Sequence, residues 1–163
     1  MFSFLKQKHT KKKSDLFAYV SGRVIPIEEV KDGVFSEKIL GDGLAILPEE
    51  DILCAPCDGE IVMMMKESGH ACGIRLENGI EILLHIGLDT VDMQGSGFRM
   101  LVEEHDRVKR GQELIQFDRE KIREAGCRDE VILVVPDTGS AGSIQIFSGQ
   151  YAYRGETKVM QIE

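Results

Sequence analysis

Short apolar runs, each ending at glycine, proline or a group of acids, make up most of this chain and limit what it can fold into. Runs that are separated by turn signals about every 8–12 residues are typical of antiparallel sandwiches and barrels. The 17 glycines suit that many tight corners. We therefore predict an all-β fold, an antiparallel β-sandwich or barrel-sandwich of many short strands with one or two short helices. The predicted strands are residues 17–20, 23–27, 44–47, 52–55, 60–65, 98–102, 113–117, 130–135, 143–147 and 158–162.

One segment predicts a helix instead, over residues 118–126. Asp118 is a good N-cap, because its carboxylate can accept hydrogen bonds from free N–H groups of the first turn. Gly126 can take the left-handed conformation that ends a helix.

Asn78-Gly79 lies between two strand-like runs that contain His70 and His85. Asn-Gly is typical of a two-residue type I′ hairpin turn, because both turn residues need positive φ. With this turn, Cys72 pairs with His85, and His70 falls on the same face. The two histidines are then diagonal neighbours, roughly 7–8 Å apart at the backbone. The prediction depends on the turn, because a slip of one residue puts them on opposite faces.

The composition is that of a soluble globular domain. The 163 residues suit one domain, and 42% are hydrophobic and 29% charged. No apolar run approaches the roughly 20 residues of a membrane helix, and the start lacks a secretory signal, so we predict a cytoplasmic location. The four cysteines are accordingly predicted to be free thiols.

Charge divides the chain into a basic tail, residues 1–15, and a body, residues 16–163. Residues 1–14 carry five lysines and no acid, so a total of −8 leaves −13 for the rest. An acidic body argues against nucleic acid as a partner and favours basic partners or cations. The tail is either a solvated segment or makes a weak contact with anionic lipid, through its lysines with Met1, Phe2, Phe4 and Leu5.

Several motifs in fixed order carry a resemblance that covers residues 16–163. The most specific is LHIGLDTV at residues 84–91, which contains His85. The others lie at residues 34–43, 55–61, 69–71, 97–98, 108–111, 117–118, 148–149 and 155–157. With these motifs the chain resembles the glucose-type IIA domains of the bacterial phosphoenolpyruvate-dependent sugar phosphotransferase system.

The resemblance implies an all-β sandwich with a shallow apolar active-site depression. It implies that the protein takes a phosphoryl group from the phosphocarrier protein HPr and passes it to a cysteine of the IIB domain of a membrane sugar permease. His85 matches the histidine that is phosphorylated on Nε2, and His70 matches the supporting histidine. Ser68 stands where many members have a threonine that orients the second histidine. Asp32 and Asp89 match acidic positions at the partner-facing rim.

The residue types suit this chemistry. Neutral imidazole is a nucleophile near neutral pH, and a fixed partner for one ring nitrogen leaves the other free. Gly87 allows the backbone to come close enough to supply a carbonyl as that partner. His70 can then hydrogen-bond a phosphoryl oxygen, while acids at the rim can bind the basic residues of donor and acceptor. No cofactor or metal is required.

Three positions depart from the family pattern. Lys66 and Cys72 replace residues that are often apolar or aromatic in the depression, and Cys57 replaces an aliphatic residue.

Four other interpretations stay open. A regulatory module whose phosphorylation state controls other proteins uses the same residues. A zinc-dependent hydrolase would use His70, His85 and an acid, and adventitious zinc would be held by His70, Cys72 and His85. Cys54 and Cys57 have the CxxC spacing of redox or zinc sites, but no second CxxC follows. Lys66, after three methionines, suggests a biotinyl- or lipoyl-type carrier but lacks a tight hairpin tip around it.

Overall fold

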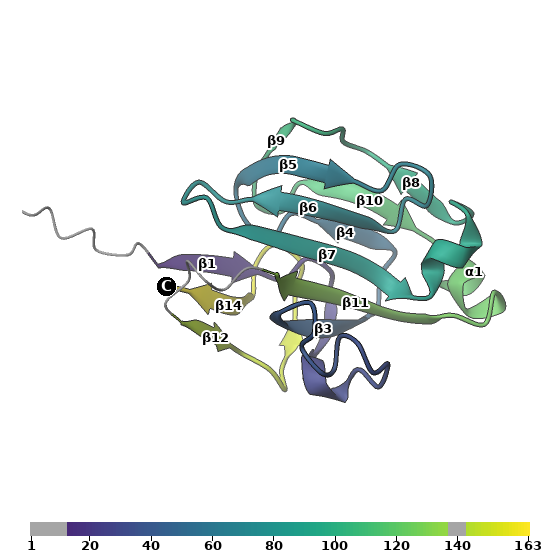
Figure 1. The fold of residues 1–163 in the computed structure, drawn as a ribbon, viewed down its shortest axis with the longest axis horizontal. Coiled ribbons are helices and arrows are strands. Elements are labelled where there is room, and N and C mark those ends of the chain that lie inside the picture. Colours follow the sequence, from purple (N-terminus) through teal and green to yellow (C-terminus); the bar gives the residue numbers. More distant parts are fainter. Residues whose placement is uncertain (1–12, 137–142) are drawn as a thin grey trace, which may run out of the picture.

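A computed structural model of the chain describes residues 13–136 and 143–163. Within them, antiparallel strands form three sheets, and the helical elements are α1 (Arg119–Glu124) with the short 3-10 turns η1 (Ile27–Glu29) and η2 (Thr90–Met93) (Figure 1). The predicted all-β sandwich is confirmed. In the described part of the chain, no helix has the length and apolar character needed to cross a membrane.

The largest sheet has eight strands and carries the predicted hairpin. Its order is β13 (Tyr151–Ala152), β2 (Gly22–Pro26), β3 (Asp42–Pro48), β11 (Arg128–Val135), β7 (Glu81–Leu88), β6 (Ala71–Arg75), β5 (Gly59–Met64) and β9 (Arg107–Val108). Two three-stranded sheets complete the fold. One has the order β1 (Ser14–Phe17), β14 (Lys158–Ile162), β12 (Ile144–Ile146), and the other β4 (Ile52–Cys54), β10 (Glu113–Phe117), β8 (Phe98–Met100).

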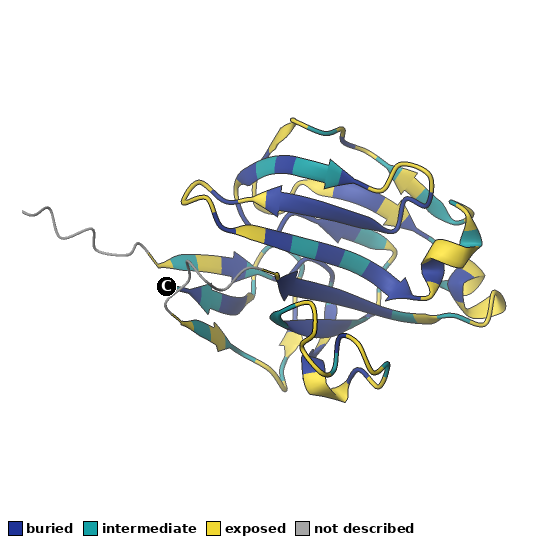
Figure 2. Cartoon of the chain, in the orientation of Figure 1, coloured by how far each residue is buried: buried dark blue, intermediate teal, exposed yellow. Residues whose placement is uncertain are grey.

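The main core joins the inner face of the eight-stranded sheet to both smaller sheets. Ile82, Leu84 and Ile86 of β7 belong to it, together with Leu114 of β10 and Ile162 of β14. Buried residues alternate with less buried ones along most of β7 and are nearly continuous along β11 (Figure 2). A smaller apolar cluster lies on the outer face, under the loop of residues 30–41. Its members are Ile25, Ile27, Val30, Phe35, Ala45, Leu88, Ile132 and Val134.

Helix α1 begins and ends where the sequence predicts. The Asp118 carboxylate accepts a hydrogen bond from Lys121 N at 3.1 Å, as an N-cap does. At the other end Gly126, with φ +78°, donates to Arg123 O, and Cys127 donates to Ile122 O, which is a Schellman ending.

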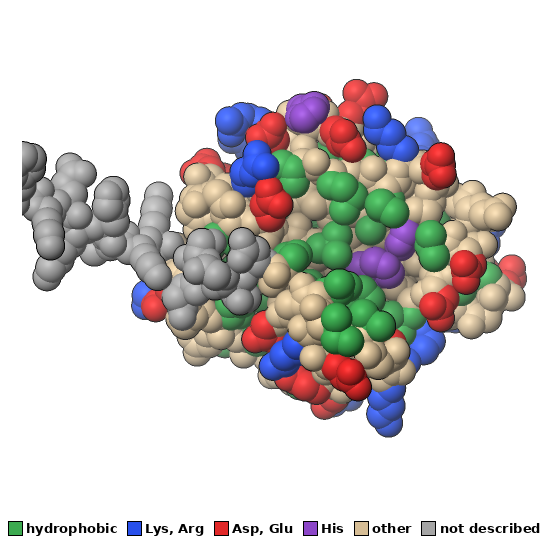
Figure 3. Space-filling model, viewed as in Figure 1, with side chains coloured by type: hydrophobic (Ala, Val, Ile, Leu, Met, Phe, Trp, Pro, Cys, Tyr) green, Lys and Arg blue, Asp and Glu red, His purple; other side chains and the backbone are tan. Residues whose placement is uncertain are grey.

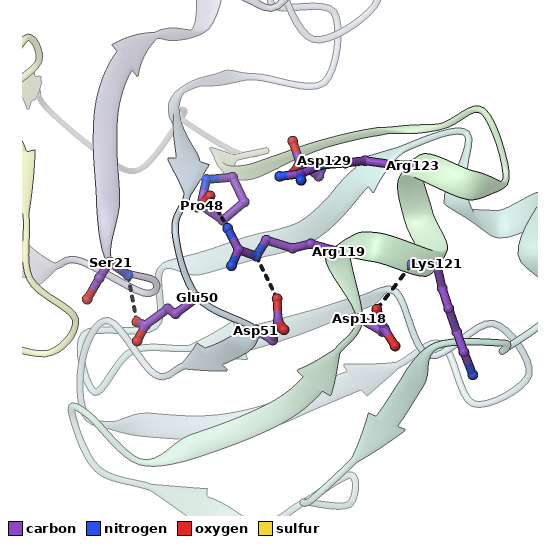
Figure 4. Close-up of polar contacts among 9 residues, drawn as sticks. All are labelled: Ser21, Pro48, Glu50, Asp51, Asp118, Arg119, Lys121, Arg123 and Asp129. Atoms are coloured by element: carbon purple, nitrogen blue, oxygen red, sulfur yellow. Dashed lines mark hydrogen bonds and ion pairs between the residues drawn. The ribbon is translucent and has the colours of Figure 1, made fainter.

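Ion pairs join the helix to the chain around it (Figure 4). Arg119 Nε lies 2.6 Å from an Asp51 carboxylate oxygen, and Arg119 also donates to Pro48 O. Arg123 contacts Asp129 at 2.9 Å, just before the buried part of β11. These contacts fix the helix against both β11 and the turn before β4.

The register of the central hairpin differs from the prediction. His85 pairs with Ala71, and Cys72 pairs with Leu84 instead of His85. The connection is one residue longer than a type I′ turn, since Leu76 N donates to Ile80 O, and of its residues only Gly79 has positive φ. Cys72 is therefore turned into the main core and is fully buried. The expectation that it lies on the face of His85 and lines the depression is wrong.

The folded body begins earlier than predicted, and its first strand is also shorter at the other end. A strand was expected over residues 17–20, but β1 ends at Phe17. Residues 18–20 are buried in irregular backbone, which is satisfied by hydrogen bonds such as Ala18 N to Thr157 O and Cys54 N to Tyr19 O. β1 begins at Ser14, within the segment predicted as tail. The lipid contact predicted for the tail involves residues 1–12, which lie outside the described residues.

Candidate active site

His85 is held at one ring nitrogen by the backbone of its own strand. Its Nδ1 lies 2.8 Å from the carbonyl oxygen of Gly87. Because a carbonyl only accepts hydrogen bonds, Nδ1 must carry the proton in this contact. The neutral ring then has its lone pair on Nε2. This geometry makes Nε2 the nucleophilic atom of the side chain.

Glycine is required at position 87 for two reasons. Its φ of +73° lies in the left-handed region that side chains disfavour. A Cβ there would also lie 2.5 Å from Thr90 Cγ2 and 2.7 Å from Arg128 O. As predicted, Gly87 supplies the carbonyl that partners His85.

His70 lies beside His85 in spite of the changed register. The ring centroids are 4.7 Å apart, and the ring planes meet at 85°. His70 immediately precedes β6 and follows Gly69, whose φ of +67° interrupts the regular alternation of side chains. Its carbonyl accepts a hydrogen bond from Ile86 N at 2.7 Å, which ties it to β7. The two histidines therefore lie side by side, as predicted. The regular hairpin register on which that prediction was based is not the one observed.

Ser68 holds the second histidine. Its Oγ lies 2.6 Å from His70 Nδ1, and the two residues are only 6% and 4% exposed. A hydroxyl can donate or accept, so it fits either tautomer of His70. When it donates to Nδ1, the proton of His70 resides on Nε2 and is available to a bound group.

Both imidazoles are neutral at pH 7. Burial lowers the pKa of His85 to about 4, with a further lowering by neighbouring His70, while the Gly87 carbonyl and Asp32 act in the opposite direction. Burial also lowers the pKa of His70. Neutral imidazole is the nucleophilic form of histidine, and His85 keeps this form across the physiological pH range.

The histidines lie among apolar side chains on the outer face of the eight-stranded sheet. The Phe35 ring is 5.0 Å from the ring of His85. Figure 3 shows histidines in the middle of an apolar area whose margin carries acidic side chains. His85 lines a depression of about 520 Å³. Its other lining residues include Asp32, Val34, Phe35, Leu40, Asp89 and Val91.

A comparison with known families shows to which family the chain belongs. Residues 14–140 match the family described as phosphoenolpyruvate-dependent sugar phosphotransferase system, EIIA 1. The chain belongs to this family. It is an EIIA component, a member of a phosphotransferase family that works in sugar transport.

Individual EIIA relatives agree with this assignment over nearly the whole chain. A glucose-specific EIIA component of Bacillus cereus is 44% identical over 147 residues, which cover 90% of this chain and 88% of the relative. One from Staphylococcus epidermidis is 36% identical over 159 residues, covering 98% and 95%. The solved structure of the glucose permease IIA from Mycoplasma capricolum is 33% identical, with a TM-score of 0.81, and covers 91% of this chain and 96% of that one.

The two acids predicted at the rim of this EIIA component differ in their surroundings. Asp89 is exposed and has a φ of +60°, immediately before η2. The Asp32 carboxylate instead accepts hydrogen bonds from the N–H groups of Val34, Phe35 and Ser36. Partial burial raises the pKa of Asp32, but these three hydrogen bonds together with the Ser36 side chain lower it more, so the net shift is downward. Asp32 therefore also holds the loop that brings Phe35 to His85.

Two residues beside the site, Phe35 and Thr90, are not among those predicted from the sequence. An aspartate at position 32 followed by a short turn is a signal for side-chain capping of the next N–H groups, and it could have pointed to Phe35. No local signal distinguishes Thr90 from an ordinary helix-start residue.

The rival sites are not assembled in the described residues. No group of three or more histidine, cysteine, aspartate and glutamate side chains there is placed to hold a metal ion. The set His70, Cys72 and His85 fails because Cys72 faces the core. Cys54 and Cys57 are buried, and burial raises the pKa of each thiol to about 12, which does not suit redox chemistry.

Proposed function

We propose that His85 carries a phosphoryl group between two proteins of the sugar phosphotransferase system. Its Nε2 takes the group from a phosphohistidine of HPr and gives it to a cysteine of the IIB domain of a sugar permease. The observation that supports this role most directly is the 2.8 Å contact between His85 Nδ1 and Gly87 O, because it leaves Nε2 unprotonated. The lowered pKa of His85, about 4, keeps that form populated at neutral pH.

Both transfer steps balance without a base in this protein. The Nε2 lone pair attacks phosphorus, a P–N bond to Nε2 forms, and the P–N bond of the donor histidine breaks with its electron pair returning to that ring. His85 loses no proton, because its only one stays on Nδ1 and remains donated to Gly87 O. In the second step the thiolate of the acceptor cysteine attacks phosphorus and the electron pair returns to Nε2. Positioning and electrostatics then account for the catalysis.

His70 and Ser68 stabilise the charge on the transferred group in this proposal. The Ser68 hydroxyl donates to His70 Nδ1, and His70 Nε2–H donates to a phosphoryl oxygen beside His85. The 2.6 Å contact between Ser68 and His70 and the 4.7 Å separation of the two rings support this arrangement. Because both groups are buried and already held, little reorganisation is needed at the moment of transfer.

Asp32 and Asp89 are proposed to bind the basic residues of HPr and of the IIB domain. Both acids line the depression that contains His85. Basic residues of a partner would pair with them and also neutralise phosphoryl charge. The surrounding apolar surface, with Val34, Leu40 and Val91 each more than 40% exposed, supports docking of a folded partner.

The transfer function is assigned to residues 16–163 together with Ser14 and Asp15 of β1, and the basic tail that precedes them is accessory in this proposal. We place the protein in the cytoplasm, where both partners would meet it. Deletion of residues 1–12 should leave the rate of phosphorylation by phospho-HPr unchanged. The relatives are named glucose-specific, so a glucose permease is the first acceptor to test.

A regulatory role of the same surface is a second candidate. Exposed apolar side chains surround His85, and phosphorylation would place about two negative charges among them. Proteins that dock on the unmodified surface would then be released. Pull-downs with the unphosphorylated and phosphorylated protein would separate such partners from HPr and IIB.

The proposal is tested by reconstitution. Incubation with phosphoenolpyruvate, enzyme I and HPr should add one acid-labile phosphate to the protein. His85→Gln should accept none, whereas His70→Gln should accept phosphate and pass it to a IIB domain much more slowly. His105→Gln, an exposed histidine outside the depression, is the matched control and should behave as wild type. Labelling of the His85→Gln protein would contradict the assignment.

A further inference from the structure

Thr90 is a fully buried polar residue that the transfer chemistry does not use. It begins η2, directly after a stretch in which Gly87 and Asp89 both have positive φ. Regular strand hydrogen bonding ends with β7 at Leu88. The carbonyl of Gly87, on which the proton position of His85 depends, therefore lies where the strand changes into a turn.

The hydroxyl of Thr90 reaches back to the strand. Its Oγ1 donates to Ile86 O at 2.6 Å. Ile86 N donates to His70 O at 2.7 Å, so the two polar groups of this one residue connect Thr90 on one side with His70 on the other. Ile86, which lies between His85 and Gly87, is thus held at both its N–H group and its carbonyl group.

The methyl group of Thr90 limits Gly87 as well. The position that a Cβ on Gly87 would occupy lies 2.5 Å from Thr90 Cγ2 and 2.7 Å from Arg128 O. The Cα of Gly87 therefore sits in a space closed by the methyl group and by the backbone of β11. Thr90 thus restrains two consecutive residues, Ile86 through its hydroxyl group and Gly87 through its methyl group.

We propose that Thr90 is a positioning residue for His85. Its contacts hold the Gly87 carbonyl in line with His85 Nδ1, and this carbonyl selects the tautomer of His85 with a free Nε2. The catalytic consequence rests on the proposed phosphoryl transfer, but the tautomer itself does not. A neutral imidazole can carry its proton on either nitrogen, and only the Nδ1–H form can attack through Nε2. A glycine backbone left without the Thr90 contacts has more freedom to turn its carbonyl away.

The test reads the tautomer of His85 directly in the unphosphorylated protein. Two-bond ¹H–¹⁵N NMR spectra of histidine-labelled protein distinguish Nδ1–H from Nε2–H, and His85→Gln identifies the signals. Thr90→Val keeps the size of the side chain and removes the hydroxyl, whereas Thr90→Ser keeps the hydroxyl. Thr90→Cys, with a much weaker donor, replaces Thr90→Val if that variant does not fold. Ile162→Val, a buried substitution in the sheet of β14, controls for a loss of stability alone.

The wild type and Ile162→Val should show the Nδ1–H form, and Thr90→Ser, which keeps the hydroxyl group but lacks the methyl group, should show more of it than Thr90→Val. Thr90→Val should show a mixture of tautomers and a phosphorylation rate by phospho-HPr that is lower by about threefold to tenfold, the effect of losing one hydrogen bond of ordinary net strength. A pure Nδ1–H form in Thr90→Val and Thr90→Cys would overturn the proposal, and so would an Nε2–H form in the wild type. Failure of the wild type to become phosphorylated on His85 would overturn the proposed function instead and leave the tautomer result standing.

Discussion

The two faces of β7 are built by different rules. On the inner face, Ile82, Leu84 and Ile86 are at most 1% exposed and pack into the main core. On the outer face, Leu83 and His85 are half-buried, and the chain then leaves the strand pattern at Gly87. Regular alternation thus produces the core, whereas the site depends on backbone irregularities at Gly69 and Gly87. Substitutions on the two faces should separate stability from transfer.

The largest effect is expected at Gly87. Gly87→Ala adds a methyl group against Thr90 and the Arg128 carbonyl and also forces alanine to a φ of +73°. We expect a loss of about 3–5 kcal/mol in the free energy of unfolding, measured with urea, and loss of phosphorylation. Gly79→Ala is the matched control, because its φ is +90° and nothing lies within 4 Å. It should cost only about 1–2 kcal/mol. Equal costs would show that the close contacts at Gly87 do not matter.

Neighbouring leucines compare the two faces directly. Leu84→Ala removes a fully buried side chain and should lower the free energy of unfolding by about 3 kcal/mol. Leu83→Ala, on the half-buried outer face, should cost less than about 1 kcal/mol. If Leu83 belongs to the docking surface, its variant should raise the KM for phospho-HPr while Leu84→Ala leaves it unchanged. Urea denaturation and transfer kinetics on both variants measure this difference.

Acid should destabilise the protein through the outer face. The folded pKa of His85 is about 4, below its unfolded value of about 6.5. Between these values the unfolded state binds more protons, so stability falls as the pH falls. From pH 7 to pH 5 His85 should account for a loss of about 2 kcal/mol, which is absent in His85→Gln. The inner face has no such response, because burial keeps the Cys72 thiol protonated with a pKa of about 12. Identical pH dependence of both proteins would contradict the lowered pKa.

The smallest effects concern the two acids. Asp32→Ala removes the acceptor of three N–H groups and should cost about 1 kcal/mol, with slower transfer because Phe35 is no longer held beside His85. Asp89→Asn keeps a residue that tolerates positive φ and should leave stability unchanged. It should reduce the salt dependence of the association with HPr. Thermal denaturation and transfer rates at two salt concentrations test this pair. A stability loss in Asp89→Asn as large as in Asp32→Ala would show that the acids play the same role.

Local chemistry was predictable from the sequence. The ends of α1 followed from Asp118 and Gly126, because capping involves only neighbours in the chain. The carbonyl partner of His85 followed from Gly87, two residues away. In both cases one residue type performs a task that few others can.

Register was not predictable, because it depends on packing across the whole sheet. Asn78-Gly79 suggested a two-residue turn, but Asn78 keeps negative φ and its side chain accepts from Ile80 N at 3.1 Å. The longer turn places Cys72 in the core beside Leu84. The change of register did not move His70 away from His85, because His70 lies outside the regular strand, directly after Gly69. The capping of the next N–H groups by Asp32 had a local signal in the sequence, but the contact of Phe35 with His85 depends on how the whole loop packs against the sheet.

The distribution of the cysteines has a practical consequence for experiments in solution. Three of the four thiols, those of Cys54, Cys57 and Cys72, are buried, with their pKa values raised to about 12. Cys127 alone is partly accessible, and it follows Gly126, which lines the depression of His85. A maleimide dye should therefore label the native protein at a single position. Its fluorescence would report the arrival and departure of each partner in real time, without any engineered cysteine.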